Sequence, residues 1–201
     1  LALHRHRFSP IIDTVRAALR GFSGLRIDHV MGLFRLWLVP PGMSAQQGAY
    51  VRMPAEVLLG IARVEAERAG AFLVGEDLGT VEPGVREALA SAGILGTKVA
   101  WFEPDPPTRW PEPCLATITT HDLPTIAGVW QARDGDRGMA EWLESLTRVP
   151  AGALTESVAL ALHELLARSP ARLRLATLDD LTGATHRPNV PGTITEHPNW
   201  R

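Results

Sequence analysis

Residues 71–76 read Ala-Phe-Leu-Val-Gly-Glu, a short apolar run that ends directly in a carboxylate. Such a run is typical of a strand that is buried on both faces of a parallel sheet. Two other segments have the same form: residues 24–28 end in Asp28, and residues 114–122 end in His121 and Asp122. Parallel α/β barrels carry their reactive groups at the carboxyl ends of strands. The pattern therefore predicts an α/β fold with its chemistry at one edge of the sheet.

Helices and strands alternate along most of the chain. Apolar residues at helical spacing, with Pro or Gly near the ends, predict the helices, and β-prone runs predict the strands. The predicted helices cover residues 11–20, 54–69, 83–92, 138–147 and 155–167, and the predicted strands cover 24–27, 71–74, 97–102, 114–119 and 173–178. Residues 44–51 and the Pro-containing tail after residue 182 are predicted to be loops. Five strands alternating with helices favour a parallel sheet with right-handed crossovers.

Composition narrows the class of protein. The chain has 201 residues, of which 45% are hydrophobic and 21% charged, as in ordinary globular proteins. The net charge of −2 with no basic stripe argues against nucleic acid as a partner. No apolar run reaches the roughly 18 residues of a membrane span, so we expect no membrane partner. Cys114 is the single cysteine, which excludes a disulfide within the chain; without a signal-peptide pattern, we expect a cytoplasmic protein.

Asp28 and Glu76 are the first candidates for catalysis. Arg26 precedes Asp28 by two positions and so lies on the same strand face, where its guanidinium favours the charged carboxylate that a nucleophile requires. The alternative is a structural Arg–Asp pair. Glu76 stands where a partly buried carboxyl group could act as a general acid. The alternative is an acid that caps a helix, and the neighbouring Asp77 suits that role better.

His121, Asp122 and His29 are less specific signals. Asp122 could accept hydrogen bonds from sugar hydroxyls, and His121 could contact one as well, but Asp122 could equally cap a helix starting near Pro124. His29 could be a structural histidine. Metal binding is the rival chemistry for such residues, but the chain has no tight His/Glu ligand spacing, and we expect no metal. Phosphate-binding glycine loops and a nucleophile elbow are also missing from the sequence.

Four segments together resemble one family. Residues 25–33 (Leu-Arg-Ile-Asp-His-Val-Met-Gly-Leu) look like the nucleophile region of bacterial 4-α-glucanotransferases, the amylomaltases or disproportionating enzymes of glycoside hydrolase family 77. Residues 74–81 resemble the acid/base segment, and residues 120–125 resemble the segment of the third carboxylate. The tail, with residues 187–193 and 199–201, is similar to the carboxyl-terminal signature of that family.

The resemblance implies a fold and an extent. It covers residues 1–201 as the carboxyl-terminal portion of a (β/α)8 catalytic domain, with the upstream barrel strands absent. The five predicted strands would be strands four to eight of the parent barrel, a partial TIM barrel. We expect this fragment alone to be inactive.

The resemblance also implies a reaction. Segments of α-1,4-linked glucan would pass between maltooligosaccharides, or to glucose, by a retaining double displacement. Asp28 would be the nucleophile, Glu76 the acid/base and Asp122 the third carboxylate, while Arg26, His29, His121 and Asn189 would contact substrate; no cofactor is implied. The partners would be maltooligosaccharides, glucose and glucans derived from starch or glycogen. Alternatives are a related α-glucan hydrolase or branching enzyme, and an inactive glucan-binding fragment.

Overall fold

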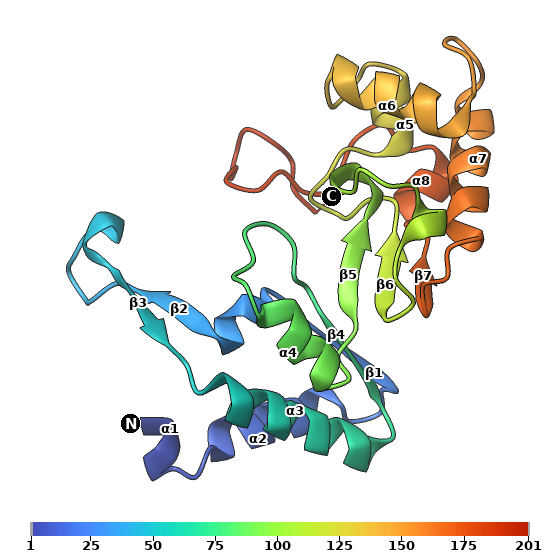
Figure 1. The fold of residues 1–201 in the computed structure, drawn as a ribbon. Coiled ribbons are helices and arrows are strands. Elements are labelled where there is room, and N and C mark those ends of the chain that lie inside the picture. Colours follow the sequence, from blue (N-terminus) through green and yellow to red (C-terminus); the bar gives the residue numbers. More distant parts are fainter. Residues whose placement is uncertain (1, 201) are drawn as a thin grey trace. The chain divides into compact units, whose positions relative to one another are not determined.

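A computed structural model describes residues 2–200, which form two compact units, Leu1–Thr97 and Lys98–Arg201 (Figure 1). The boundary between the units falls within strand β5 (Gly96–Val99). Every helix in the described part of the chain is too short or too polar to cross a membrane.

The first unit contains two strands that pair in parallel and a separate hairpin. Its elements are α1 (Ala2–Arg5), α2 (Ser9–Ala18), β1 (Gly24–Ile27), β2 (Arg35–Leu38), β3 (Ala49–Arg52), α3 (Ala55–Ala69), β4 (Phe72–Gly75) and α4 (Val85–Ser91). Strands β1 and β4 are parallel, with Gly24 opposite Phe72 and Ile27 opposite Gly75. The two predicted strands at 24–27 and 71–74 are therefore confirmed as parallel neighbours.

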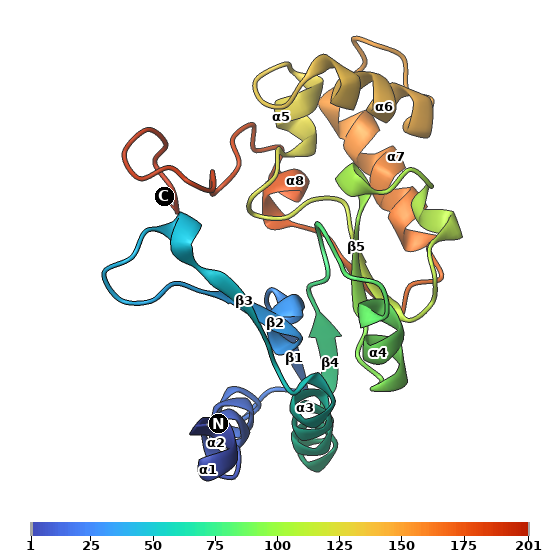
Figure 2. The same ribbon diagram turned by 60° about the vertical axis from the view of Figure 1, so that its left-hand side comes forward.

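Helix α3 shows why the sequence folds as it does in this unit. It starts after Pro54 and ends at Gly70, whose left-handed φ of 63° allows the chain to turn back into β4. Its buried face includes Leu58, Leu59 and Ala62. Helices α2 and α3 lie side by side (Figure 2), and the guanidinium of Arg16 binds the buried carboxylate of Glu65 at 2.7 and 2.9 Å. This hydrogen bond lowers the pKa of Glu65 below its usual value.

The hairpin β2–β3 is a departure from the sequence prediction. Residues 44–51 were expected to form a loop, but Ala49–Arg52 is a strand that pairs with β2 in antiparallel fashion. The expectation was wrong because the apolar run at 34–39 ends in a Pro-Pro-Gly turn. Several further loop residues then separate this run from β3, so the sequence gives no sign that the two segments pair.

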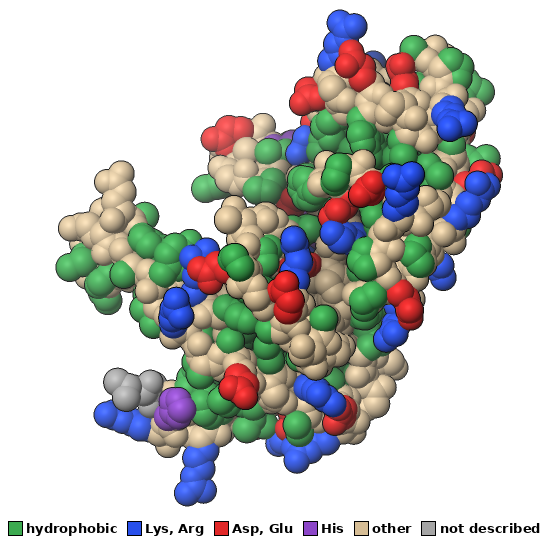
Figure 3. Space-filling view, in the orientation of Figure 1, with side chains coloured by type: hydrophobic (Ala, Val, Ile, Leu, Met, Phe, Trp, Pro, Cys, Tyr) green, Lys and Arg blue, Asp and Glu red, His purple; other side chains and the backbone are tan. Residues whose placement is uncertain are grey.

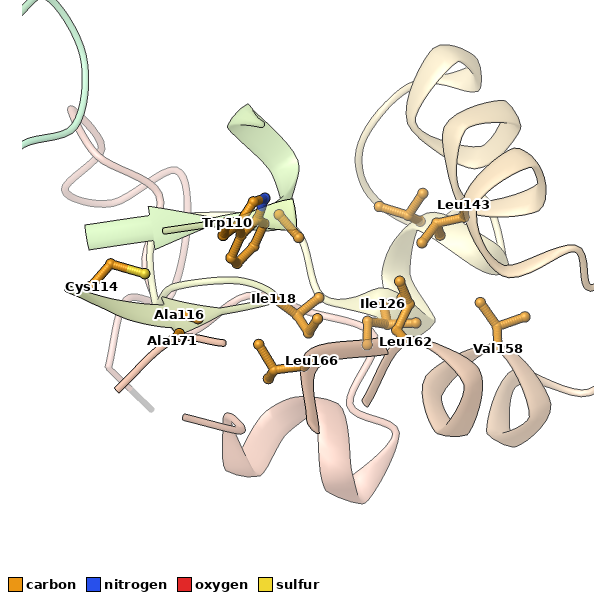
Figure 4. Packing of buried hydrophobic residues seen from close by; sticks show 12 residues of the cluster. Trp110, Cys114, Ala116, Ile118, Ile126, Leu143, Val158, Leu162, Leu166 and Ala171 are labelled. Atoms are coloured by element: carbon orange, nitrogen blue, oxygen red, sulfur yellow. The ribbon is translucent and has the colours of Figure 1, made fainter. Parts of the chain in front are cut away.

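The second unit packs helices against two parallel strands. Its elements after β5 are β6 (Cys114–Thr117), α5 (Ile126–Trp130), α6 (Arg137–Thr147), α7 (Thr155–Ala167), β7 (Leu173–Leu175) and α8 (Leu178–Thr182). Strands β6 and β7 are parallel, with Leu115 opposite Leu173. Figure 4 shows the core, in which Ile118, Ile126, Leu143 and Leu162 meet between β6 and the helices. Cys114 is buried there, and its thiol donates to the carbonyl oxygen of Pro111 at 3.0 Å.

Three predicted strands are shorter than expected, and one of them, predicted over 114–119, is β6, which ends at Thr117. Strand β5 ends at Val99, because residues 100–102 form a 3-10 turn. Strand β7 ends at Leu175, because Leu178 already begins α8. The sheets are small: β1–β4, β2–β3 and β5–β6–β7, so residues 2–200 do not form the single five-stranded sheet that the alternation predicted.

Candidate active site

The ends of β1 and β4 bring two candidate carboxylates into one neighbourhood. Ile27 and Gly75 form the last register pair, and Asp28 and Glu76 are the next residue on each strand. Gly75 permits a close approach, since a Cβ atom at this position would lie 3.1 Å from the side chain of Val30. The sequence prediction that Asp28 and Glu76 follow strand ends is confirmed.

Glu76 is held firmly by the backbone around it. Its Oε2 accepts from the N–H of His29 at 2.9 Å, and its Oε1 accepts from the N–H of Leu78 at 2.8 Å. The peptide group of Glu76 also bonds on both sides, donating to the oxygen of Ile27 and accepting from the N–H of Val30. These hydrogen bonds give the carboxylate a defined orientation. Because the side chain is only partly buried, the carboxylate also retains access to solvent.

His29 supplies one of these bonds through an unusual backbone conformation. Its φ of 45° lies in the left-handed region, which few residues other than glycine adopt. This turn directs the N–H of His29 at Glu76, and it separates β1 from the 3-10 turn of residues 30–33. Backbone strain of this kind is concentrated at functional sites.

Asp28 and Arg26 form the expected ion pair. Arg26 Nη1 lies 2.6 Å from Asp28 Oδ1, and the two side chains are 43% and 77% exposed. An exposed pair contributes little to stability, typically about 0–1 kcal/mol. A purely structural role is therefore a weak explanation, whereas the guanidinium does fix the orientation of the Asp28 carboxylate.

Asp77 does not cap a helix, which corrects the sequence interpretation. It is buried, its Oδ1 accepts from the N–H of Thr97 at 2.7 Å, and its Oδ2 accepts from Arg86 Nε at 3.0 Å. Helix α4 begins only at Val85, after Gly84. Asp77 instead ties the segment after Glu76 to the start of β5 and to α4.

A second group of candidates lies in the second unit. Asn189 Nδ2 donates to Asp122 Oδ1 at 2.6 Å, and the N–H of Asn189 donates to the oxygen of His121 at 3.0 Å. His121 Nε2 lies 3.4 Å from the same Asp122 oxygen. The loop after β6 and the carboxyl-terminal tail, far apart in sequence, thus meet at His121, Asp122 and Asn189.

Asp122 has no role in capping a helix. Helix α5 is capped by Thr125, whose Oγ1 accepts from the N–H of Gly128 at 3.0 Å. The alternative interpretation of Asp122 is therefore wrong, and its carboxylate, partly exposed, is held by Asn189 and His121.

Arg187 and Trp200 belong to this second group and were not among the predicted site residues. Arg187 Nη1 donates to the carbonyl oxygen of Asp122 at 3.0 Å, while its Nε and Nη2 donate to Asp134 at 2.7 and 2.6 Å. The Arg187 guanidinium holds the pKa of Asp134 below its usual value. The ring of Trp200 lies 5.2 Å from that of His121. The only sequence signal for either residue was its place in the tail motif.

Arg26, Asp28, His29 and Glu76 belong to the unit Leu1–Thr97, and His121, Asp122 and Asn189 to the unit Lys98–Arg201. Within the described range 2–200, no three His, Cys, Asp or Glu side chains are grouped so that they could hold a metal ion. Each of the two groups contains an orientated carboxylate with Arg, His or amide donors beside it. Such side chains are suited to binding hydroxyl groups and to transferring protons.

Sequence comparisons match the whole chain to one family. The family described as 4-alpha-glucanotransferase matches residues 1–201. The 4-alpha-glucanotransferase of Mycobacterium tuberculosis is 40% identical over 238 aligned residues, covering 99% of this chain and 32% of that protein. The 4-alpha-glucanotransferase of Haemophilus influenzae is 34% identical, covering 96% of this chain and 33% of that protein. The chain spans about a third of the length of these curated relatives.

Structural comparisons agree. The amylomaltase of Corynebacterium glutamicum is 33% identical with a TM-score of 0.83, covering 98% of this chain and 34% of that one. An amylomaltase of Streptococcus agalactiae, solved in complex with acarbose, has a TM-score of 0.78 at 21% identity, covers 98% of this chain and 40% of that one, and supports the fold alone.

Proposed function

Since this chain belongs to the 4-alpha-glucanotransferase family, glycoside hydrolase family 77, we propose that it is the carboxyl-terminal portion of the catalytic domain of an enzyme that transfers α-1,4-glucan segments. Donors and acceptors would be maltooligosaccharides or glucose, with longer glucans from starch or glycogen as sources. Strands β1, β4, β5, β6 and β7 would be strands four to eight of a (β/α)8 barrel that the rest of the enzyme completes.

The observation that carries the proposal is the pair Asp28 and Glu76 at matching ends of parallel strands. Neighbouring strands lie about 4.8 Å apart. A retaining mechanism needs its two carboxyl groups about 5–5.5 Å apart. Asp28 and Glu76 therefore leave neighbouring backbones side by side, a placement from which their side chains can take up the separation that this mechanism requires.

The reaction proceeds in two displacement steps. The Asp28 carboxylate attacks the anomeric carbon of the donor, the bond from that carbon to the glycosidic oxygen breaks, and Glu76 gives its proton to the departing oxygen. The acceptor 4-hydroxyl then attacks the same carbon, the bond to Asp28 breaks, and Glu76 takes up the hydroxyl proton. The backbone N–H groups of His29 and Leu78 hold Glu76 in position for both transfers.

The remaining candidates bind and orient the substrate. Arg26 holds the Asp28 carboxylate through their 2.6 Å contact. Asp122 would bind hydroxyl groups of the distorted sugar and favour a transition state with oxocarbenium character, orientated by Asn189 at 2.6 Å. His29, His121 and Asn189 supply further hydrogen-bonding groups for the donor sugar.

Maltotriose tests the proposal. The complete enzyme that carries this chain should convert maltotriose into glucose and a series of longer maltooligosaccharides, resolved by chromatography. Glucose and maltose without longer chains would contradict transfer and indicate a hydrolase. New α-1,6 linkages in the product would indicate a branching enzyme.

A further inference from the structure

The hairpin β2–β3 carries an aromatic pair that the proposed mechanism does not use. Trp37 and Tyr50 are register partners, their rings are 4.9 Å apart at 70°, and they are 46% and 58% exposed. The Arg35 guanidinium lies on the same face, 4.2 Å from the centre of the Tyr50 ring. Figure 3 shows hydrophobic side chains gathered over this hairpin. We call Arg35, Trp37 and Tyr50 the aromatic face.

Trp37 is fixed in place despite its exposure. Its Nε1 donates to the carbonyl oxygen of Ala45 at 3.1 Å, so the polar edge of the indole is satisfied within the hairpin. Gly48 lies against the ring, and a Cβ atom there would be 2.5 Å from Nε1. Ser44 and Gln47 brace the intervening turn, with the Ser44 N–H donating to Gln47 Oε1 at 2.9 Å. A ring already held in one orientation loses little conformational entropy when a ligand binds.

The base of the hairpin connects to both candidate catalytic segments of the first unit. Its first strand follows Asp28 after one 3-10 turn. Arg35 Nη1 lies 2.5 Å from Glu82 Oε1, in the segment that follows Glu76. The base of the hairpin is therefore tied to the two chain segments that carry Asp28 and Glu76, within the same unit.

We propose that the aromatic face binds an α-glucan chain at glucose units remote from the bond that is broken. The proposal rests on the proposed function. The C–H groups of a glucose ring form an apolar surface that packs on an aromatic ring, and Arg35 has N–H donors for its hydroxyl groups. The other face of the hairpin, with Leu36 and Leu38, is aliphatic and has no aromatic ring in the register. It supplies the matched control.

Donor length is the measured variable. In the complete enzyme, KM is determined for maltotriose and for maltoheptaose, and the ratio of the two KM values is compared between variants. Trp37→Ala and Tyr50→Ala should each raise KM for maltoheptaose relative to maltotriose about tenfold, the change expected from roughly 1.4 kcal/mol of lost contact. Trp37→Phe, which keeps a ring, should restore most of the ratio. Leu38→Ala, also 50% exposed, should leave it unchanged.

The outcomes separate this inference from the proposed function. If Trp37→Ala and Tyr50→Ala are active and their ratio of KM values is unchanged, the aromatic face does not bind glucan, and the proposed transfer reaction stands. An unchanged ratio with a lowered midpoint of thermal unfolding would show that the rings pack against protein, which also overturns this inference. A wild-type enzyme that binds maltoheptaose in calorimetry but transfers no glucan would contradict the proposed function. Loss of that binding in Trp37→Ala would still support glucan binding by the aromatic face.

Discussion

Arg187 is the residue on which the second group of candidates depends. Its three donated bonds join Asp134 to the carbonyl oxygen of Asp122. Lysine keeps the charge but cannot reproduce the planar fork of donors. We expect Arg187→Lys to lower the free energy of unfolding by about 1.5–3 kcal/mol, as for hydrogen bonds to charged groups. Urea denaturation measures this loss, and the transfer rate should fall with it because Asp122 loses its support.

Arg168 provides the control for this substitution. Its contact with Glu164 is 3.5 Å long and exposed, one helical turn apart. Arg168→Lys should change the free energy of unfolding by no more than about 0.5 kcal/mol. Equal losses in Arg187→Lys and Arg168→Lys would contradict the role assigned to Arg187.

Asp180 gives a pH dependence with a defined sign. Burial raises the pKa of its carboxyl group, although the Ile126 N–H and the Thr177 hydroxyl both donate to it. Because the folded pKa lies above the unfolded value of about 3.9, this group stabilises the fold most at low pH. That contribution is lost as pH rises through the folded pKa.

Two variants of Asp180 test this sign. Asp180→Asn should remove the decline in stability above about pH 4, because asparagine accepts from Ile126 without carrying a charge. Asp180→Ala should cost about 1–3 kcal/mol at every pH, since the buried N–H of Ile126 loses its partner. Thermal unfolding between acid and neutral pH measures both. A decline that persists in Asp180→Asn would show that another group titrates.

At the scale of elements, the junction of β1 and β4 depends on a glycine. A Cβ atom at Gly75 would press on Val30 at 3.1 Å, in a buried position beside Glu76. We expect Gly75→Ala to destabilise the fold by about 1–3 kcal/mol through overpacking. Gly60 is the matched control, because it lies inside helix α3 with no atom within 4 Å of its added Cβ. Gly60→Ala should stabilise by about 0.4–1 kcal/mol. Chemical denaturation distinguishes the two, and a neutral Gly75→Ala would contradict the close packing.

Elements with a strong local pattern were predictable from the sequence, and those defined by a distant partner were not. Helix α3 has apolar spacing between Pro54 and Gly70, and both strand runs ending at Ile27 and Gly75 are short and apolar. Strand β3 has no such pattern, because its residues are all exposed and its extended conformation depends on pairing with β2. Likewise, Asp28 and Glu76 follow recognisable strands, whereas Arg187 acts through contacts with residues 134 and 122 that no local pattern reports.

At the scale of the whole molecule, the second unit leaves large apolar side chains in solvent. Leu154, Leu160, Leu178, Leu181 and Ile194 are between 62% and 89% exposed. Contiguous exposed apolar surface promotes association. We expect residues 1–201, expressed alone, to self-associate and to show no transfer from maltotriose. Light scattering after size exclusion and the maltotriose assay measure both properties. A monodisperse chain with the activity of the complete enzyme would contradict the proposal that it is one portion of a larger barrel.

Trapping of the glycosyl-enzyme tests the central claim, the division of roles between Asp28 and Glu76. Fluoride leaves without protonation, so an α-glucosyl fluoride can glycosylate Asp28 even in Glu76→Gln, where the slow second step lets the adduct accumulate. Mass spectrometry of the digested complete enzyme should find that adduct on the peptide containing Asp28, and Asp28→Asn should give none. Equal trapping in both variants, or an adduct on a different residue, would contradict the assignment.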